Sequence, residues 1–424
     1  MRLNLAYGTT GLPLELDDAR FDATVLLPKD PPAHPDPRAA FAAAVARPLG
    51  ARPLAELARA KAPKRVAIAI ADHTRPVPDH LLVPWIVEQL GVNDAAITII
   101  IGTGTHRGST GEELARMLGA AAGRFRIVNH DCQRQDELVL LGRSRCGGEC
   151  WLNRAWVEAD LRIATGFIEP HFFAGFSGGS KGVVPAIAGL ATVQHFHRAA
   201  LIAHPRTTWG DPAGNPLQAL TREMTALCPP DFIVNVTLNL RKEITAVYAG
   251  ETIAAHDAGC AAALHEAMIP VSRRYPVVVT TNSGYPLDQN FYQAVKGISA
   301  AARIVEPGGT IIAVSRCNNG LPDEGEFRRL LADPRPSDQL LAAILASERT
   351  PHDQWQVQTL LQCGAGARIV LYSELPSGDQ RLTRTAHTRD IAATLETERC
   401  RRALDRLPVA VLPMGPLTIP VLRA

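Results

Sequence analysis

Short apolar runs alternate with helical segments along most of the chain, and this alternation limits the fold more than any other feature. In the first half the runs lie at residues 64–70, 96–101, 125–128 and 161–165. A second series lies at 276–281, 310–314, 368–372 and 409–413. Strands that are apolar along their whole length are typical of parallel sheets covered by helices on both faces. The sequence therefore predicts an α/β protein with mostly parallel sheets.

A break in the polar stretch Val271-Ser272-Arg273-Arg274-Tyr275-Pro276 separates the two series. A chain of 424 residues is long enough for two or three domains. We therefore expect an N-terminal α/β domain at residues 1–271 and a C-terminal α/β domain at 272–424. The last segment is expected to pack back on the N-terminal domain.

Composition excludes several classes of protein. The formal net charge is +2, which argues against general binding of nucleic acid. No apolar run approaches the ~20 residues that a membrane-spanning helix needs. The eight cysteines are scattered, and the close pair Cys146 and Cys150 is spaced too widely for a C-x-x-C motif. We expect reduced thiols in a cytoplasmic protein.

Two loops that follow predicted strands carry polar side chains suited to ligand binding. Asp72 can bind sugar hydroxyls, and the guanidinium of Arg75 can clamp a phosphate or a carboxylate. The alternative is that both side chains cap a helix that starts near Asp79. In the second loop, glycines allow a ligand to approach the backbone closely, and His106 follows them. A histidine in such a loop is otherwise an ordinary solvated side chain.

The third loop, residues 169–197, is the richest in reactive side chains. It contains a histidine, a glycine-rich turn and a lysine, namely His171, Gly175, Ser177, Gly178, Gly179 and Lys181. The turn departs from the phosphate loop G-x-x-x-x-G-K-[ST], because Ser180 precedes the lysine and Gly182 follows it. A nucleoside triphosphatase is therefore not expected, whereas a backbone nest for a single phosphate is. His106, His171 and His197 also permit a zinc site, although their spacing matches no zinc motif.

In the second half of the chain, Gln293 and Lys296 lie one turn apart on a predicted helix. Side by side they would suit a small carboxylate; the alternative is a solvated helix face. Trp355 stands at a polar helix start, where it is either a core residue or the wall of a pocket.

Four motifs follow one another in a fixed order. They are Asp72-His73-Thr74-Arg75-Pro76, Gly104-Thr105-His106, Glu169-Pro170-His171 with the turn up to Lys181, and Tyr292-Gln293-x-x-Lys296. Together they resemble the nickel-pincer lactate racemase family, from about residue 60 to the C-terminus. The resemblance implies a two-domain α/β enzyme with its active site in the cleft between the domains. It also implies a racemase or epimerase for a 2-hydroxy acid, either lactate or a larger hydroxy or sugar acid.

The resemblance further implies a nickel-pincer nucleotide, a pyridinium-3-thioamide-5-thiocarboxylic acid mononucleotide that holds nickel. Lys181 would attach it covalently, and Asp72 would bind its ribose. The remaining cofactor-binding residues would be Gly175, Ser177, Gly178 and Gly179. His197 would ligate the nickel, with His195 as the alternative. Separate maturation enzymes would supply this cofactor.

For the reaction, the resemblance implies that His106 and His171 are the general acid and base. Hydride would move reversibly from the substrate to the cofactor through a 2-oxo acid. The substrate-binding residues would be Arg75, Tyr292, Gln293, Lys296 and Trp355, of which Arg75, Gln293 and Lys296 would hold the carboxylate and the hydroxyl.

The chain departs from the family pattern beside Lys181, where an arginine usually precedes the lysine and a serine follows it. Ser180 and Gly182 stand there instead, which indicates a changed phosphate contact or a different substrate. Two other functions would use the same residues. One is a zinc-dependent hydrolase that uses the three histidines, and the other is a non-catalytic nucleotide- or phosphate-binding protein.

Overall fold

The chain folds into two compact units. The structure, a computed structural model, describes residues 1–211, 213–322 and 325–423. The first unit comprises Asp30–His197 and Arg206–Glu266. The second unit comprises Met1–Lys29, Arg198–Pro205 and the described residues from Ala267 onward.

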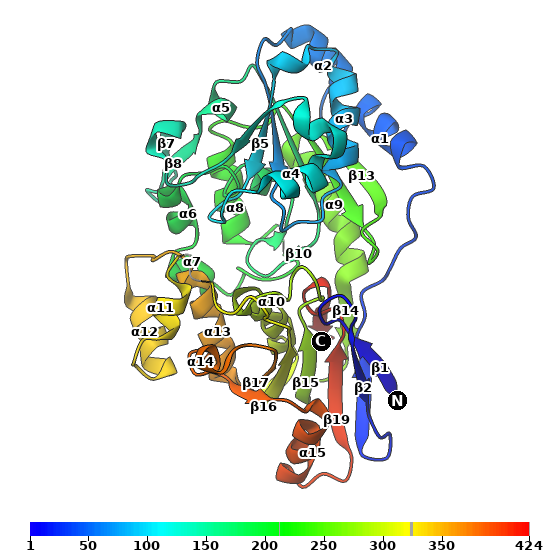
Figure 1. Ribbon diagram of the computed structural model, residues 1–424, viewed down its shortest axis with the longest axis vertical. Helices are drawn as coiled ribbons and strands as arrows, with labels where there is room; N and C mark the ends of the chain where they lie inside the picture. The colour runs from blue at the N-terminus through cyan, green and yellow to red at the C-terminus, as the bar shows by residue number, and fades with distance from the viewer. Residues whose placement is uncertain (212, 323–324, 424) are drawn as a thin grey trace. The chain divides into compact units, whose positions relative to one another are not determined.

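The first unit is built on a six-stranded sheet (Figure 1). Its strands, in order across the sheet, are β13 (Ile244–Gly250), β12 (Phe232–Leu238), β9 (Leu161–Phe167), β4 (Val66–Ala71), β5 (Ile97–Gly102) and β6 (Arg126–Asn129). All neighbouring strands are parallel except β12 and β13. The central strand β4 is buried at five of its six positions, as expected for a strand covered on both faces.

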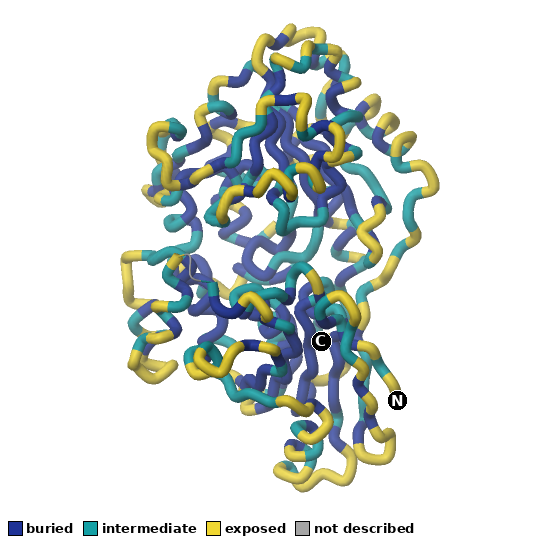
Figure 2. Tube along the Cα trace, in the orientation of Figure 1, coloured by how far each residue is buried: buried dark blue, intermediate teal, exposed yellow. Residues whose placement is uncertain are grey.

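Helices pack against this sheet and close its core. They are α1 (Pro37–Ala46), α2 (Leu54–Lys61), α3 (Asp79–Leu90), α4 (Gly111–Leu118), α5 (Arg154–Val157), α6 (Leu190–Phe196), α8 (Pro216–Thr225) and α9 (Thr252–Ala267). Two small antiparallel sheets complete the unit, β7 (Leu138–Arg143) with β8 (Glu149–Asn153) and β10 (Pro170–His171) with β11 (Gly175–Phe176). The strands appear as the dark, buried centre in Figure 2.

The second unit has its own six-stranded sheet, which is parallel throughout. In order its strands are β18 (Ala386–Thr388), β17 (Ala367–Tyr372), β16 (Val305–Val314), β15 (Tyr275–Thr281), β19 (Leu407–Leu412) and β3 (Phe21–Val25). Its helices are α7 (Ala199–Ile202), α10 (Phe291–Ala302), α11 (Phe327–Leu331), α12 (Ser337–Ala346), α13 (Gln354–Gly366), α14 (Ser377–Gln380) and α15 (Ile391–Arg401). The small sheets are β1 (Arg2–Leu5) with β2 (Leu12–Glu15) and β14 (Met268–Val271) with β20 (Ile419–Leu422).

This division differs from the expected domains at the N-terminus. Residues 1–29 belong to the second unit, because β3 pairs with β19 and thereby becomes an edge strand of the second sheet. The C-terminal strand β20 pairs with β14 in the same unit. The second unit resumes at Ala267, close to the expected boundary at 272.

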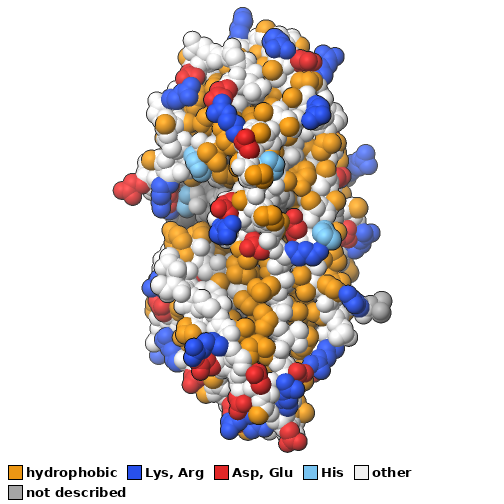
Figure 3. Space-filling model, turned by 90° about the vertical axis from the view of Figure 1, so that its right-hand side faces the viewer, with side chains coloured by type: hydrophobic (Ala, Val, Ile, Leu, Met, Phe, Trp, Pro, Cys, Tyr) orange, Lys and Arg blue, Asp and Glu red, His pale blue; other side chains and the backbone are white. Residues whose placement is uncertain are grey.

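The surface carries mixed charge. On the face in Figure 3, basic side chains are interspersed with acidic ones. Throughout the described part of the chain, no helix is both long and apolar enough to cross a membrane.

A carboxyl group is buried in the first unit. Asp79 at the start of α3 is 1% exposed, and its Oδ1 accepts a hydrogen bond of 2.7 Å from the hydroxyl of Thr165. Burial raises the pKa of Asp79 from 3.8 to about 7. The folded state therefore favours the protonated acid, and ionising it costs stability.

This burial predicts a pH-dependent effect of Asp79→Asn. The cost of ionisation is absent below pH 4, grows up to pH 7 and is constant above it. At pH 8 the variant should therefore exceed the parent in free energy of unfolding by an amount on the order of a few kcal/mol. Denaturant titrations at pH 4 and pH 8 measure the difference, with the exposed Asp405→Asn as control. An equal effect at both pH values would contradict the assignment.

Candidate active site

Three loops with chemically active side chains leave the same edge of the first sheet. They follow β9, β4 and β5, which are adjacent and parallel. The carboxyl ends of parallel strands lie at one edge, which is where open α/β sheets bind ligands. The sheet order therefore brings together the three motifs that the sequence singled out.

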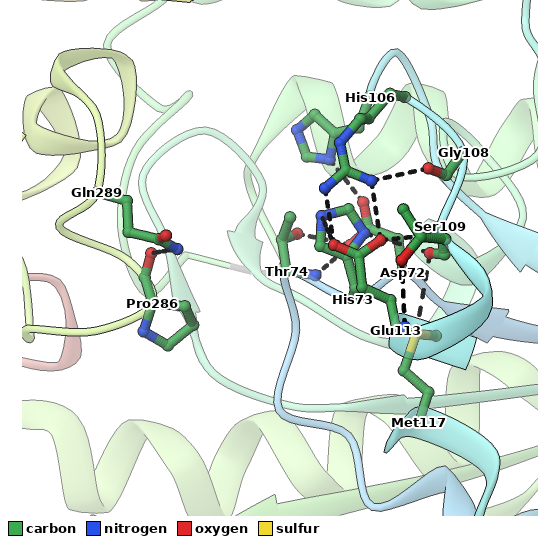
Figure 4. A network of polar contacts seen from close by, with 12 residues as sticks. Asp72, His73, Thr74, His106, Gly108, Ser109, Glu113, Met117, Pro286 and Gln289 are labelled. Carbon is green, nitrogen blue, oxygen red and sulfur yellow. Dashed lines mark hydrogen bonds and ion pairs between the residues drawn. The ribbon is translucent and has the colours of Figure 1, made fainter. Parts of the chain in front are cut away.

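In the first loop, the Asp72 carboxylate is fixed by hydrogen bonds to both of its oxygens (Figure 4). Oδ1 accepts from the backbone N–H and the hydroxyl of Thr74, at 3.1 and 2.6 Å. Oδ2 lies 2.6 Å from Nδ1 of His106. Neither Asp72 nor Arg75 caps α3, since Pro78 is the N-cap residue and makes no side-chain capping bond. The helix-capping alternative is therefore wrong.

The charge state of Asp72 follows from its surroundings. Burial alone would raise the pKa of this carboxyl. The charge and the hydrogen bond of His106, together with the charge of Arg75, outweigh that effect and hold the pKa well below its usual range. Asp72 is therefore a carboxylate near neutral pH, and Arg75 donates to the hydroxyl of Thr74 at 2.9 Å.

The second loop is anchored on both sides of His106. The backbone N–H of Gly104, a residue with φ of 58°, donates to the carbonyl of Ala186 at 2.9 Å. Arg107 makes two hydrogen bonds with Glu113, of 2.8 and 2.7 Å, and these bonds lower the pKa of Glu113 to about 2. Glu113 also forms a capping box with Thr110 at the start of α4. His106 therefore sits in a braced loop rather than as a freely solvated side chain.

Beside this pair lies a second histidine. His73 places Nδ1 3.2 Å from the hydroxyl of Ser109 and Nε2 3.6 Å from Oε1 of Glu113 (Figure 4). Burial lowers its pKa. His73 thus ties the Asp72 loop to the start of α4.

The third loop begins with the tight β10–β11 hairpin, which carries His171. Nδ1 of His171 accepts from the backbone N–H groups of Phe173 and Ala174, both at 3.2 Å. Gly175 has φ of 78°, and a Cβ there would lie 2.9 Å from the backbone of Asp211. The hairpin therefore requires glycine at this position and sets the orientation of the imidazole.

Two residues that the sequence analysis did not select form hydrogen bonds with the backbone of the glycine-rich turn. Asn235 on β12 accepts from the N–H of Gly179 at 2.7 Å. His256 on α9 donates from Nε2 to the carbonyl of Ser177 at 2.9 Å, and burial lowers its pKa to about 4. A Cβ on Gly179 would lie 2.5 Å from the ring of His256. Asn235 and His256 are far from the turn in sequence, and no local motif marks them.

Lys181 lies in the short 3₁₀ turn Gly179–Gly182. Its N–H donates to the carbonyl of Gly178 at 3.1 Å. The hydroxyl of Ser177 bonds back to the carbonyl of Phe167 at 2.9 Å, so it helps to close the loop. Ser180, which precedes the lysine, is 3% exposed.

His195 and His197 have different surroundings. Nδ1 of His197 lies 2.9 Å from the carbonyl of Val193 and donates to it, which places the ring lone pair on Nε2. Nε2 of His195 instead lies 3.2 Å from the thiol of Cys146. A backbone contact on one ring nitrogen is the usual arrangement for a metal-binding histidine. Geometry therefore favours His197 over His195 as a ligand.

The expected substrate residues of the second half all lie in the second unit. Trp355 is 3% exposed, and its indole N–H donates to the hydroxyl of Tyr292 at 2.9 Å. Gln356 donates to the backbone carbonyl of Tyr292 at 2.5 Å. Gln293 lies in the first turn of α10, where its backbone N–H donates to Oδ1 of Asn290, and Lys296 follows one turn later. Tyr292 and Trp355 are thus in direct contact.

The fold and these loops define an α/β enzyme, and comparison with protein families gives its class. Residues 7–210 match the lactate racemase N-terminal domain, and residues 272–414 match the lactate racemase C-terminal domain. The chain belongs to the lactate racemase family and is an isomerase.

Individual relatives agree with this assignment. A lactate racemase of Lactiplantibacillus plantarum is 36% identical over 376 residues, which is 87% of each chain. A lactate racemase of Thermoanaerobacterium thermosaccharolyticum is 34% identical over 78% of each chain. The structure of the lactate racemase apoprotein from the latter organism superposes with a TM-score of 0.91 at 29% identity, over the whole of both chains. A Thermotoga maritima structure shares the fold at a TM-score of 0.69 and 18% identity, covering 87% of this chain and 96% of that one.

The support beneath the glycine-rich turn can be tested with two alanine substitutions in the same turn. Gly179→Ala places a methyl group against His256 and strains a residue with φ of 55°. We expect the free energy of unfolding to fall by about 1–3 kcal/mol. Gly182→Ala is the matched control, because its Cβ would make only ordinary contacts at 3.5 Å. Equal denaturation midpoints for the two variants would contradict the proposed support.

Proposed function

We propose that the chain interconverts the stereoisomers of a 2-hydroxy acid at the carbon that bears the hydroxyl. Lactate is the first substrate to test, because both curated relatives are named lactate racemases. The family pattern beside Lys181 is altered, which keeps a larger hydroxy or sugar acid as the alternative substrate. The observation that carries the proposal is the placement of His106 and His171 on loops from one edge of the same sheet.

The reaction needs a hydride acceptor, because the C–H bond of a 2-hydroxy acid has no useful acidity. We propose that the acceptor is a nickel-pincer nucleotide, whose chemistry when bound is the reversible uptake of hydride. The hydroxyl proton then has to move at the same time. His106 and His171 would hold and transfer that proton at Nε2.

The residues of the first unit fit such a group. The tautomer of His197 presents an Nε2 lone pair, and an imidazole suits nickel beside soft sulfur donors. Lys181 would form the covalent attachment in its compact turn, and the turn residues Gly175, Ser177, Gly178 and Gly179 would surround the phosphate. Asp72 accepts three hydrogen bonds, and a carboxylate offers about four sites, so one remains for a ribose hydroxyl.

Substrate binding would use the side chains of Arg75, Gln293 and Lys296. Arg75 offers a planar fork that matches a carboxylate. Gln293 and Lys296 on α10 would bind the carboxylate and the hydroxyl, and the joined pair of Tyr292 and Trp355 would support them. Among the residues that the structure describes, none forms a hydrogen bond with the buried Oε1 of Gln293, which supports a role in binding.

The geometry gives less support to the two rival functions. Across the described residues, no three His, Cys, Asp or Glu side chains converge as a metal site, which a zinc hydrolase would need. A protein that only binds nucleotides would need no carboxylate-backed histidine. The eight cysteines are free thiols, which supports a cytoplasmic location beside the enzymes that mature the cofactor.

Covalent attachment is tested by intact-mass spectrometry of protein produced together with the cofactor-maturation enzymes. We expect a mass increase that maps to the peptide containing Lys181, and its absence from Lys181→Ala. Gly182→Ala, in the same turn, should keep the increase. An adduct that persists in Lys181→Ala would refute the attachment site, and an unmodified protein that contains zinc would favour the hydrolase.

The roles of the histidines can be separated by measuring nickel and racemisation together. His106→Gln and His171→Gln should each lower kcat by about 10²–10⁴-fold, while nickel content and the adduct remain, because they act on the proton. His197→Ala should lose nickel and keep the adduct. His195→Ala serves as the control and should keep both. Loss of nickel from the His106 variant would reassign that residue as a ligand.

A further inference from the structure

The carboxylate of Asp72 contacts His106 within the protein, so ligand binding is not its sole possible role. Its Oδ2 lies 2.6 Å from Nδ1 of His106, and Asp72 itself is 4% exposed. Two hydrogen bonds from Thr74 hold the other oxygen, so the carboxylate is not free to turn away. The bonds between Arg107 and Glu113 brace the loop on the other side.

This contact determines which nitrogen of His106 carries the proton. An ionised carboxylate only accepts hydrogen bonds, so Nδ1 must be the N–H donor. In the neutral ring the lone pair then lies on Nε2. The state of Asp72 agrees with this, because its pKa is held well below the usual range.

His171 is arranged in the opposite way. Two backbone N–H groups, of Phe173 and Ala174, point at its Nδ1, which must therefore carry the lone pair. In the neutral ring the proton then lies on Nε2. Both histidines thus leave Nε2 for the substrate but in different states: Nε2 of His106 is an acceptor, and Nε2 of His171 is a donor.

We propose that Asp72 is a positioning residue which holds His106 as the Nδ1–H tautomer, and that the two histidines are consequently inequivalent in the reaction. Before the reaction His106 is the carboxylate-backed base, and His171 is the group that carries a proton toward the substrate oxygen. This inference rests on the proposed function, and it adds to Asp72 a second role besides contact with a ribose.

His106 would take the proton of the substrate hydroxyl. The hydroxyl O–H bond breaks and its proton passes to Nε2, which forms an imidazolium. The hydrogen on the carbon would leave as hydride with the electron pair of the C–H bond, for which the bound cofactor would supply the acceptor, and the C=O bond would form. The substrate loses two electrons to that acceptor. Asp72 stabilises the imidazolium through Nδ1, and in the reverse step Nε2 returns its proton to the oxygen.

The test is Asp72→Asn, observed first in the protein without cofactor. An asparagine keeps an oxygen for Thr74 but can turn its NH₂ group toward Nδ1, which would move the ring proton of His106 to Nε2. Nitrogen-15 NMR of the imidazole resonances distinguishes these tautomers. We expect the parent protein to show Nδ1–H at His106 and Nε2–H at His171, and the variant to show Nε2–H at His106.

In cofactor-loaded protein, the same substitution should lower kcat by about 10²–10⁴-fold with little change in KM, because the base starts in the wrong tautomer. Thr74→Val is a milder second variant that removes one contact to Oδ1 and should have a smaller effect. Asp79→Asn, which changes a buried carboxyl at the start of α3 that is bonded to Thr165, should leave the His106 resonances unchanged.

The positioning role of Asp72 and the proposed racemisation can be refuted separately. An unchanged tautomer in Asp72→Asn, or a changed tautomer with full kcat, would overturn the positioning role while racemisation stands. Absence of racemisation in the loaded parent protein would overturn the proposed function, whereas the NMR result from the protein without cofactor would still decide the Asp72–His106 assignment.

Discussion

The parallel pairing of β9, β4 and β5 is the constraint on which the candidate site depends. Parallel neighbours end at one edge, so the residues that follow them are brought together although about a hundred positions separate Asp72 from His171 in the sequence. An antiparallel strand in the place of β4 would send Asp72 to the opposite edge. The burial of β4 on both faces is what holds this central position.

At this edge of the sheet, hydrogen bonds from neighbouring groups set the orientation of the two histidine rings. Thr74 fixes Asp72, Asp72 fixes His106, and two backbone N–H groups fix His171. Each imidazole is oriented through its Nδ1. Enzymes that transfer protons need such pre-set orientation, because a ring that is free to turn presents the wrong atom part of the time.

Much of this could be predicted from the sequence, because apolar runs and strand-end polar residues are local signals. Four strands of each sheet were predicted in that way, namely β4, β5, β6 and β9 of the first and β15, β16, β17 and β19 of the second, whereas β12, β13 and β18 were not. The place of residues 1–29 in the second unit could not be predicted from the sequence. It depends on β3, a short strand whose partner β19 lies almost four hundred residues away. Asn235 and His256 were missed for the same reason: they act on the glycine-rich turn only through the tertiary fold. The contact of Asp72 with His106 likewise depends on the order of the strands.

The pairing of β3 with β19 has a consequence for the order of events during synthesis. The ribosome makes β3 almost four hundred residues before β19, so the edge strand must wait for its neighbour. The first unit, by contrast, is complete in sequence by Glu266 and can form earlier. The nascent chain thus carries a folded central unit with an unpaired leading segment. That segment has unpaired backbone groups that need protection until β19 has been made.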